Sequence, residues 1–223
     1  MSSNSGSKKT KRQSFRRAPD SQSALGAPAP PISLDDPQLL NHPLKAGALA
    51  PSFSLRALDG TLVRLSELVR VGPIVLSFHA GTRCESCQSH LSELGALLPK
   101  IRQLGARWVA IGPKSSHHRA KTVRASLLSD PGARVAKAYG VAIALTASNV
   151  AQYQHSCHAA PRETGTQQGH LFIPATYVID RNNQVVYTCA ALKDCSTIDP
   201  AEIVTLLTSL RDREDLRRPR ART

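Results

Sequence analysis

Aromatic residues are scarce in this chain: phenylalanine, tyrosine and tryptophan make up 4% of its 223 residues. Hydrophobic residues still reach 41%, which is enough for a packed core of aliphatic side chains. Long apolar runs are also lacking, and none approaches the roughly 18 to 20 residues of a membrane-spanning helix. The sequence therefore excludes an integral membrane protein and predicts one globular domain with tails.

The sequence contains five cysteines, and no targeting signal is recognisable in it. The N-terminal segment is rich in Ser, Lys and Arg but has neither the apolar face of a transit peptide nor the apolar core of a secretory signal. Arg16 and Arg17 are not followed by a hydrophobic stretch, so a twin-arginine signal is excluded as well. We expect a cytoplasmic protein, in which an odd number of cysteines favours redox or metal chemistry over a structural disulfide framework.

Acidic residues number 16 against 29 basic ones, which gives a net charge of +13. Most of this charge lies in the tails, because residues 1–20 hold six basic residues and one acid, and residues 211–223 hold six and three. We expect a disordered, basic and proline-rich arm over residues 1–43, a folded domain over 44–210 and a basic tail over 211–223. Both tails are interpreted as solvated, with at most weak contact to anionic surfaces.

Strand and helix patterns alternate along the predicted domain. The strands are expected at 73–78, 108–111, 175–180 and 184–188, and a hairpin is expected around the turn Asp59-Gly60. One helix is expected from Cys87 to before Gly105. Two more are expected at 133–139, with Gly140 as C-cap, and at 202–210. Residues 146–170 show no period and are expected to form a long loop. This order predicts an α/β fold, a three-layer sandwich with a central mixed β-sheet flanked by helices.

The motif Cys84-Glu-Ser-Cys87 follows a buried strand and opens a helix. Unpaired N–H groups and the helix dipole stabilise a thiolate at a helix start, so Cys84 is the expected reactive thiol, assisted by the neighbouring Arg83. Cys87 lies one turn further and can reach Cys84 to close a disulfide. The alternatives are two core cysteines or half of a zinc site; the strand-to-helix context favours redox function.

A proline, Pro174, opens the strand that begins 87 residues after Cys87. Proline is tolerated at the start of a strand, and a cis bond at such a place is usually a deliberate feature. Alone, this proline is weak evidence for such a bond.

Together these segments resemble the peroxiredoxin-like proteins of the alkyl hydroperoxide reductase and thiol-specific antioxidant family. The resemblance covers roughly residues 44–210 and rests on Ala50-Pro-Ser-Phe53, Val75-Leu-Ser-Phe78, Gly81-Thr-Arg-Cys84-Glu-Ser-Cys87, Leu128-Ser-Asp130, Ala138-Tyr-Gly140 and Pro174-Ala-Thr-Tyr-Val-Ile-Asp180. It implies a thioredoxin fold, with Cys84 as the peroxidatic cysteine, Cys87 as its resolving partner and Pro174 as a cis-proline facing the thiols.

The chain departs from this family in the motif Pro-x-x-x-Thr-x-x-Cys, which polarises the peroxide. Ser77 and Gly81 stand where that motif has its proline and threonine. Thr82 is the expected substitute for the missing hydroxyl. The departure favours dithiol exchange of the thioredoxin type over efficient peroxide reduction.

A metal site is the alternative interpretation of the same thiols. His155, Cys157 and His158 cluster in the aperiodic segment and could join Cys84 and Cys87 around a soft metal ion. In a copper-chaperone relative of this fold a distant histidine completes the site, a role open to His170 here. We interpret the histidines as polar loop residues, and His42, His117 and His118 as surface residues.

Two further cysteines lie near the C-terminus. Cys189 alternates with Tyr187 and Val185 along one strand and is expected on the core side of that strand. Cys195 follows in a loop, where it is a candidate second resolving thiol.

We expect a thiol-dependent oxidoreductase that reduces peroxides or exchanges disulfides through Cys84 and Cys87. Its expected partners are a peroxide or protein-disulfide substrate and a reductant of the thioredoxin or glutathione type. No cofactor and no resident metal are expected.

Overall fold

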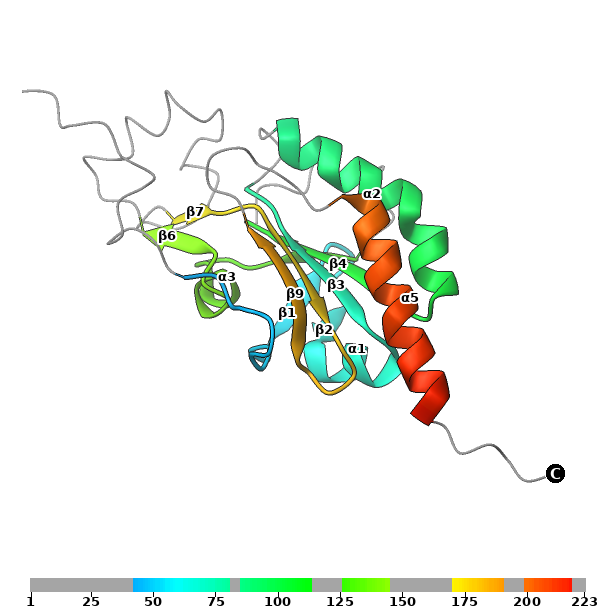
Figure 1. Cartoon of the computed structure of the whole chain (residues 1–223). Coiled ribbons are helices and arrows are strands. Elements are labelled where there is room, and N and C mark those ends of the chain that lie inside the picture. The colour runs from blue at the N-terminus through cyan, green and yellow to red at the C-terminus, as the bar shows by residue number, and fades with distance from the viewer. Residues whose placement is uncertain (1–41, 81–84, 114–125, 145–169, 191–198, 218–223) are drawn as a thin grey trace, which may run out of the picture. The chain divides into compact units, whose positions relative to one another are not determined.

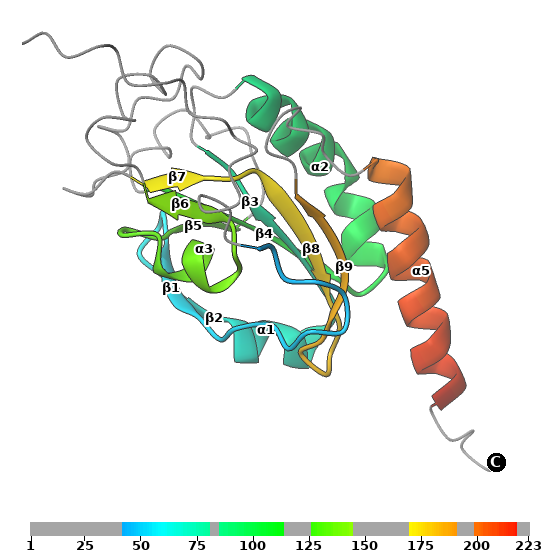
Figure 2. The same ribbon diagram turned by 60° about the vertical axis from the view of Figure 1, so that its left-hand side comes forward.

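The computed structural model describes residues 42–80, 85–113, 126–144, 170–190 and 199–217. Its main feature is a seven-stranded sheet (Figure 1), in which the strand order is β2-β1-β5-β4-β3-β8-β9 (Figure 2 labels β5 and β8). The strands are β1 Ser54–Ala57, β2 Leu62–Arg64, β3 Ile74–Phe78, β4 Arg107–Gly112, β5 Ser126–Ser129, β8 Ala175–Ile179 and β9 Val185–Ala190. Strands β3, β4 and β5 run parallel and the other pairs antiparallel, so the predicted mixed sheet is confirmed.

Helices cover both faces of this sheet (Figure 2). They are α1 Leu65–Val71, α2 Glu85–Gln103, α3 Arg134–Ala138 and α5 Pro200–Arg217. One buried apolar cluster joins the sheet to α1 and α3, and a second joins it to α2 and α5. The predicted three-layer α/β sandwich is confirmed.

Strand β3 shows how the sequence divides between the two layers. All five of its residues are buried. Ile74, Leu76 and Phe78 join the cluster beneath α1 and α3, whereas Val75 joins the cluster beneath α2 and α5. Successive side chains of a strand point to opposite faces, so a strand covered on both faces needs the continuous apolar run that predicted it.

The end of α3 depends on a glycine, as predicted. Gly140 has φ +72°, and its N–H donates to the carbonyl of Lys137. A Cβ on Gly140 would lie 2.0 Å from the carbonyl oxygen of His42. Only glycine combines this left-handed backbone with so close an approach of the incoming chain.

The structure also contains elements that the sequence pattern did not predict. Helix α1 is too short for an apolar period to be visible in the sequence. Strands β6 Ala142–Ala144 and β7 His170–Phe172 form a separate two-stranded sheet. They flank residues 145–169, which lie outside the described residues, as do residues 1–41 of the predicted arm.

The last helix is longer than predicted. Helix α5 continues to Arg217 instead of ending at residue 210. Arg and Glu have good helix propensity, so the helix can continue beyond the residues that pack against the sheet. Arg181 also forms an ion pair of 3.1 Å with Glu214 near the end of this helix. No described helix has the length and apolar composition that crossing a bilayer requires.

Candidate active site

The predicted redox motif lies at the start of α2, beyond the carboxyl end of β3. Helix α2 begins at Glu85, and Cys87, in its first turn, is buried with 2% of its surface exposed. Thr82, Arg83 and Cys84 lie outside the described residues, and Cys84 directly precedes Glu85 in the chain. The predicted association of the motif with a helix start is confirmed, and it is the position at which backbone N–H groups stabilise a thiolate.

Cys87 is disulfide-bonded in this structure. Cys189, the other described cysteine, is a thiol. The other three cysteines, Cys84, Cys157 and Cys195, lie outside the described residues. The disulfide shows that Cys87 is not simply a reduced core cysteine.

A chain of buried polar side chains lies on the sheet face that α2 covers. The indole Nε1 of Trp108, from β4, donates to Oγ of Ser77 in β3 over 3.2 Å. Ser77 Oγ lies 3.5 Å from Oγ1 of Thr176 in β8, and Thr176 Oγ1 lies 3.1 Å from Nε2 of His90 in α2. All four side chains are buried, so three strands and α2 are linked by polar contacts within an otherwise apolar layer.

His90 stands three residues after Cys87 in α2, and 6% of its surface is exposed. Residues three apart in a helix lie on the same face. Burial lowers the pKa of His90 by disfavouring the imidazolium ion, although the carboxylate of Glu93 acts in the opposite direction. His90 is therefore neutral at pH 7, and it was not identified from the sequence.

Pro174 lies between β7 and β8, and its peptide bond with Ile173 is trans rather than cis. The prediction of a cis-proline is wrong. The backbone passes through Pro174 between two strands, and a trans proline with its fixed φ is compatible with such extended chain. Pro174 is half-buried and immediately precedes Ala175, which pairs with Phe78 at the carboxyl end of β3.

His79, the residue after β3, is a second buried histidine that the sequence analysis missed. Its backbone N–H donates to the carbonyl of Ile111 over 3.0 Å. A Cβ on Gly112 would lie 2.3 Å from the His79 ring, so the absence of a side chain at Gly112 makes room for the imidazole. This histidine lies at the same end of the sheet as the start of α2.

Cys189 is half-buried in β9 and packs against the cluster beneath α2 and α5. The predicted alternation is wrong in one respect, because Val185 faces the opposite cluster. The pairing of β8 with β9 shifts its register between Val178 and Ile179, and such a bulge turns the following side chains to the other face. Burial, with the charge of Glu202, raises the pKa of Cys189, so this thiol is a poor nucleophile.

The alternative metal site finds no support in the described part of the chain. No group of three or more His, Cys, Asp or Glu side chains there is arranged to hold a metal ion. His170 is buried in β7 and His42 is exposed. His117, His118, His155, Cys157, His158 and Cys195 lie outside the described residues.

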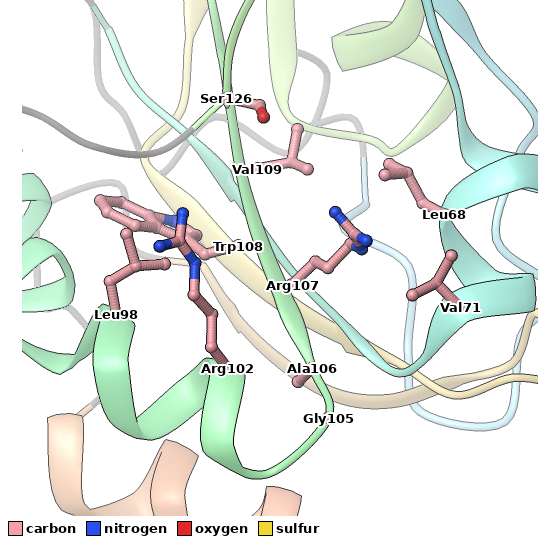
Figure 3. Close-up of a pocket in the computed structure, with 10 residues that line it drawn as sticks. All are labelled: Leu68, Val71, Leu98, Arg102, Gly105, Ala106, Arg107, Trp108, Val109 and Ser126. Carbon is pink, nitrogen blue, oxygen red and sulfur yellow. The ribbon is translucent and has the colours of Figure 1, made fainter.

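A cavity of about 380 Å³ lies at the opposite end of the sheet, beside the amino end of β4 (Figure 3). Two arginines and apolar side chains line it: Leu68, Val71, Leu98, Arg102, Gly105, Ala106, Arg107, Trp108, Val109 and Ser126. Arg107 pairs with Ile74, the first residue of β3, whereas the redox motif follows Phe78 at its other end. This cavity is therefore separate from the thiol site.

Comparison with known proteins identifies the family of the domain. The model of the AhpC/TSA family matches residues 46–188. Peroxiredoxin Q, chloroplastic, of Triticum aestivum is 32% identical over 130 residues, which are 56% of this chain and 59% of that protein. Peroxiredoxin Q, chloroplastic, of Oryza sativa subsp. japonica is 27% identical over 181 residues, 78% of this chain and 73% of its own.

Solved structures show the same fold. Peroxidoxin BcpB from Mycobacterium tuberculosis superposes with a TM-score of 0.57 at 24% identity, over 76% of this chain and 97% of its own. Peroxiredoxin Q from Xanthomonas campestris gives a TM-score of 0.55 at 17% identity, over 75% of this chain and 99% of its own. The predicted α/β class of fold is thereby confirmed.

Proposed function

This chain belongs to the AhpC/TSA family, and we propose that it acts as a thiol peroxidase in which Cys84 and Cys87 form a redox pair. The observation that carries the proposal is the buried, disulfide-bonded Cys87 in the first turn of α2, three residues after Cys84. A cysteine that enters a disulfide at a helix start is suited to reversible oxidation.

The proposed reaction has two steps. The Cys84 thiolate attacks one oxygen of the peroxide ROOH, the O–O bond breaks, and with one proton the products are the Cys84 sulfenic acid and ROH. The Cys87 thiol then attacks the sulfenic sulfur, which releases water and leaves the Cys84–Cys87 disulfide. A dithiol reductant of the thioredoxin type, or two molecules of glutathione, restores both thiols.

Exchange with protein disulfides is the second candidate, and one observation favours it. Ser77 occupies the position of the proline in the motif that polarises the peroxide, and its hydroxyl is buried and accepts a hydrogen bond from Trp108. Gly81 offers no hydroxyl at the motif threonine. In this reaction the Cys84 thiolate attacks a substrate disulfide, and Cys87 resolves the mixed disulfide that forms.

Peptide mapping of the reduced, metal-free protein after one equivalent of hydrogen peroxide tests the proposal. We expect rapid loss of two hydrogens located at Cys84 and Cys87. The variant Cys84→Ser should lose turnover, Cys87→Ser should accumulate the sulfenic acid, and Cys189→Ser should behave like the wild type. Full turnover in Cys84→Ser would contradict the proposal.

The same mapping separates the two redox reactions, and the metal content of the purified protein tests the metal-binding alternative. Slow oxidation by peroxide, together with rapid closure of the disulfide by a model disulfide, would assign dithiol exchange. Stoichiometric zinc or copper in protein purified without added metal would assign the metal-binding function. The cytoplasmic location stays a prediction, and the plant relatives carry chloroplastic names.

A further inference from the structure

The polar chain beneath α2 ends in a ring nitrogen that has no hydrogen-bond partner among the described residues. Nδ1 of His90 is buried and makes no hydrogen bond within the described part of the structure. Its other nitrogen, Nε2, contacts Thr176. Buried polar atoms are nearly always paired in native proteins, so an unpaired one on the same helix face as a redox-active thiol calls for an explanation.

One consistent order of donors along the chain places the imidazole hydrogen on Nδ1. An indole N–H can only donate, so Ser77 Oγ is the acceptor for Trp108. In the order in which each hydroxyl both accepts and donates within the chain, Ser77 donates to Thr176 and Thr176 donates to Nε2 of His90. A neutral imidazole that accepts at Nε2 carries its hydrogen on Nδ1.

The Nδ1–H group stands one turn from a sulfur whose charge changes during the reaction. Helical side chains lean toward the N-terminus of their helix, so that of His90 leans toward the turn that contains Cys87. Cys87 is disulfide-bonded here, and a disulfide sulfur is a poor acceptor. When a reductant thiolate attacks Cys84, the S–S bond breaks, a new bond joins the reductant to Cys84, and Cys87 leaves with the electron pair as a thiolate.

We propose that His90 stabilises the reduced state of the redox pair by donating a hydrogen bond from Nδ1 to the sulfur of Cys87. Thr176, Ser77 and Trp108 are positioning residues that act through His90 by holding its hydrogen on Nδ1. This inference rests on the proposed function, since it requires a Cys84–Cys87 disulfide that opens and closes.

Two substitutions of His90 separate the two ring nitrogens. In His90→Gln the amide reaches the place of Nε2 and retains the contact to Thr176, but nothing donates from the place of Nδ1. In His90→Asn the amide stands near the place of Nδ1 and the contact to Thr176 is lost. The pair Thr176→Val and Thr176→Ser removes or retains the hydroxyl that holds the tautomer, with little change in volume.

The measurement is the equilibrium of each protein with glutathione redox buffers at a single pH, with both redox states quantified by mass. We expect His90→Gln to shift the equilibrium constant about tenfold toward the disulfide, which is about 30 mV for a two-electron couple. His90→Asn should stay within about twofold of the wild type. Thr176→Val should shift in the same direction as His90→Gln, and Thr176→Ser should not.

Each other outcome is decisive. Equal shifts in His90→Gln and His90→Asn would mean that the imidazole acts through packing, and an unshifted His90→Gln would remove His90 from the redox chemistry; both overturn the inference. If His90→Gln does not fold, the Thr176 pair decides. The disulfide of the oxidised wild type is mapped first: a partner of Cys87 other than Cys84 contradicts the proposed function, whereas a confirmed pair with unshifted variants contradicts only the role of His90.

Discussion

The core cluster beneath α1 and α3 pairs its polar atoms differently from the cluster beneath α2 and α5. In the first cluster the hydroxyl of Tyr177 donates to the backbone carbonyl of Tyr139 over 2.7 Å. The hydroxyl of Tyr139 donates to the carbonyl of Pro51 over 3.0 Å. Burial raises the pKa of both tyrosines, so these hydroxyls stay protonated and donate over the whole physiological range.

In the second cluster the polar side chains pair with one another. Ser77, Thr176 and Trp108 come from three strands, and the contacts end on His90, in the helix that carries Cys87. Hydrogen bonds that end on backbone carbonyls hold the backbone in place and do not continue to another side chain. A chain of side chains that ends on a titratable ring, three residues after Cys87 in the same helix, connects the sheet to the proposed site.

The difference follows from the alternation of side chains along the strands. Ser77 and Thr176 lie directly opposite each other in the antiparallel pair β3 and β8. Their neighbours Leu76 and Tyr177 also pair, and these point to the other face. Adjacent residues thus serve stability on one face and, by our proposal, reactivity on the other. The following predictions test this division.

The largest expected effect comes from emptying part of the first cluster. Leu76 is fully buried at 0% exposure, so Leu76→Ala should lower the free energy of unfolding by about 2 to 5 kcal/mol. Urea denaturation measures the loss, and Leu58→Ala, at a side chain that is 53% exposed, is the control with a small effect. The folded fraction of Leu76→Ala should still consume peroxide at the wild-type rate. A slower rate in the folded fraction would contradict the division between the two faces.

A smaller loss of stability is expected from removing one hydroxyl of the same cluster. Tyr177→Phe deletes the donor to the Tyr139 carbonyl, which keeps a second, longer hydrogen bond of 3.3 Å from the N–H of Leu44. We expect a loss of about 1 to 2 kcal/mol in urea denaturation, without a change in the glutathione equilibrium. Tyr187→Phe removes a more exposed hydroxyl, bonded to Glu202, and should cost less. A redox shift in Tyr177→Phe would show that the first cluster also controls the thiols.

The local patterns of the sequence were sufficient to predict most of the sheet. Strand β3, the helix after Cys84 and the glycine at the end of α3 each have a signal within a few residues. Helix α1 and strand β6 were missed because seven and three residues are too few to show a period. The prediction of a cis-proline was wrong because the path of the backbone through Pro174 depends on the strands on both sides of it. The dipeptide Ile173-Pro174 does not encode that path.

The candidate site was predictable only in its local part. Cys87 follows from the motif, whereas the contact between Ser77 and Thr176 joins residues 99 positions apart and exists only in the observed strand register. One signal was available: His90 interrupts the apolar face that continues from Cys87 to Leu91 and Leu94. A histidine on the buried face of a helix that begins with a redox motif is a candidate functional residue.

The pH dependence of stability gives the finest test of the second cluster, because His90 has a pKa below its ordinary value of 6.5 in the folded protein. As the pH falls through 6.5, the unfolded chain binds a proton at this position before the folded protein does, so stability is lost on acidification. The slope from this one group is at most about 1.4 kcal/mol per pH unit.

His90→Asn, which cannot titrate, should therefore lose less stability than the wild type between pH 7 and about pH 5. Urea denaturation across this range measures both slopes. Equal slopes in the wild type and His90→Asn would mean that His90 binds protons equally well in the folded and unfolded chains. The layer beneath α2 would then not disfavour the imidazolium ion more than water does.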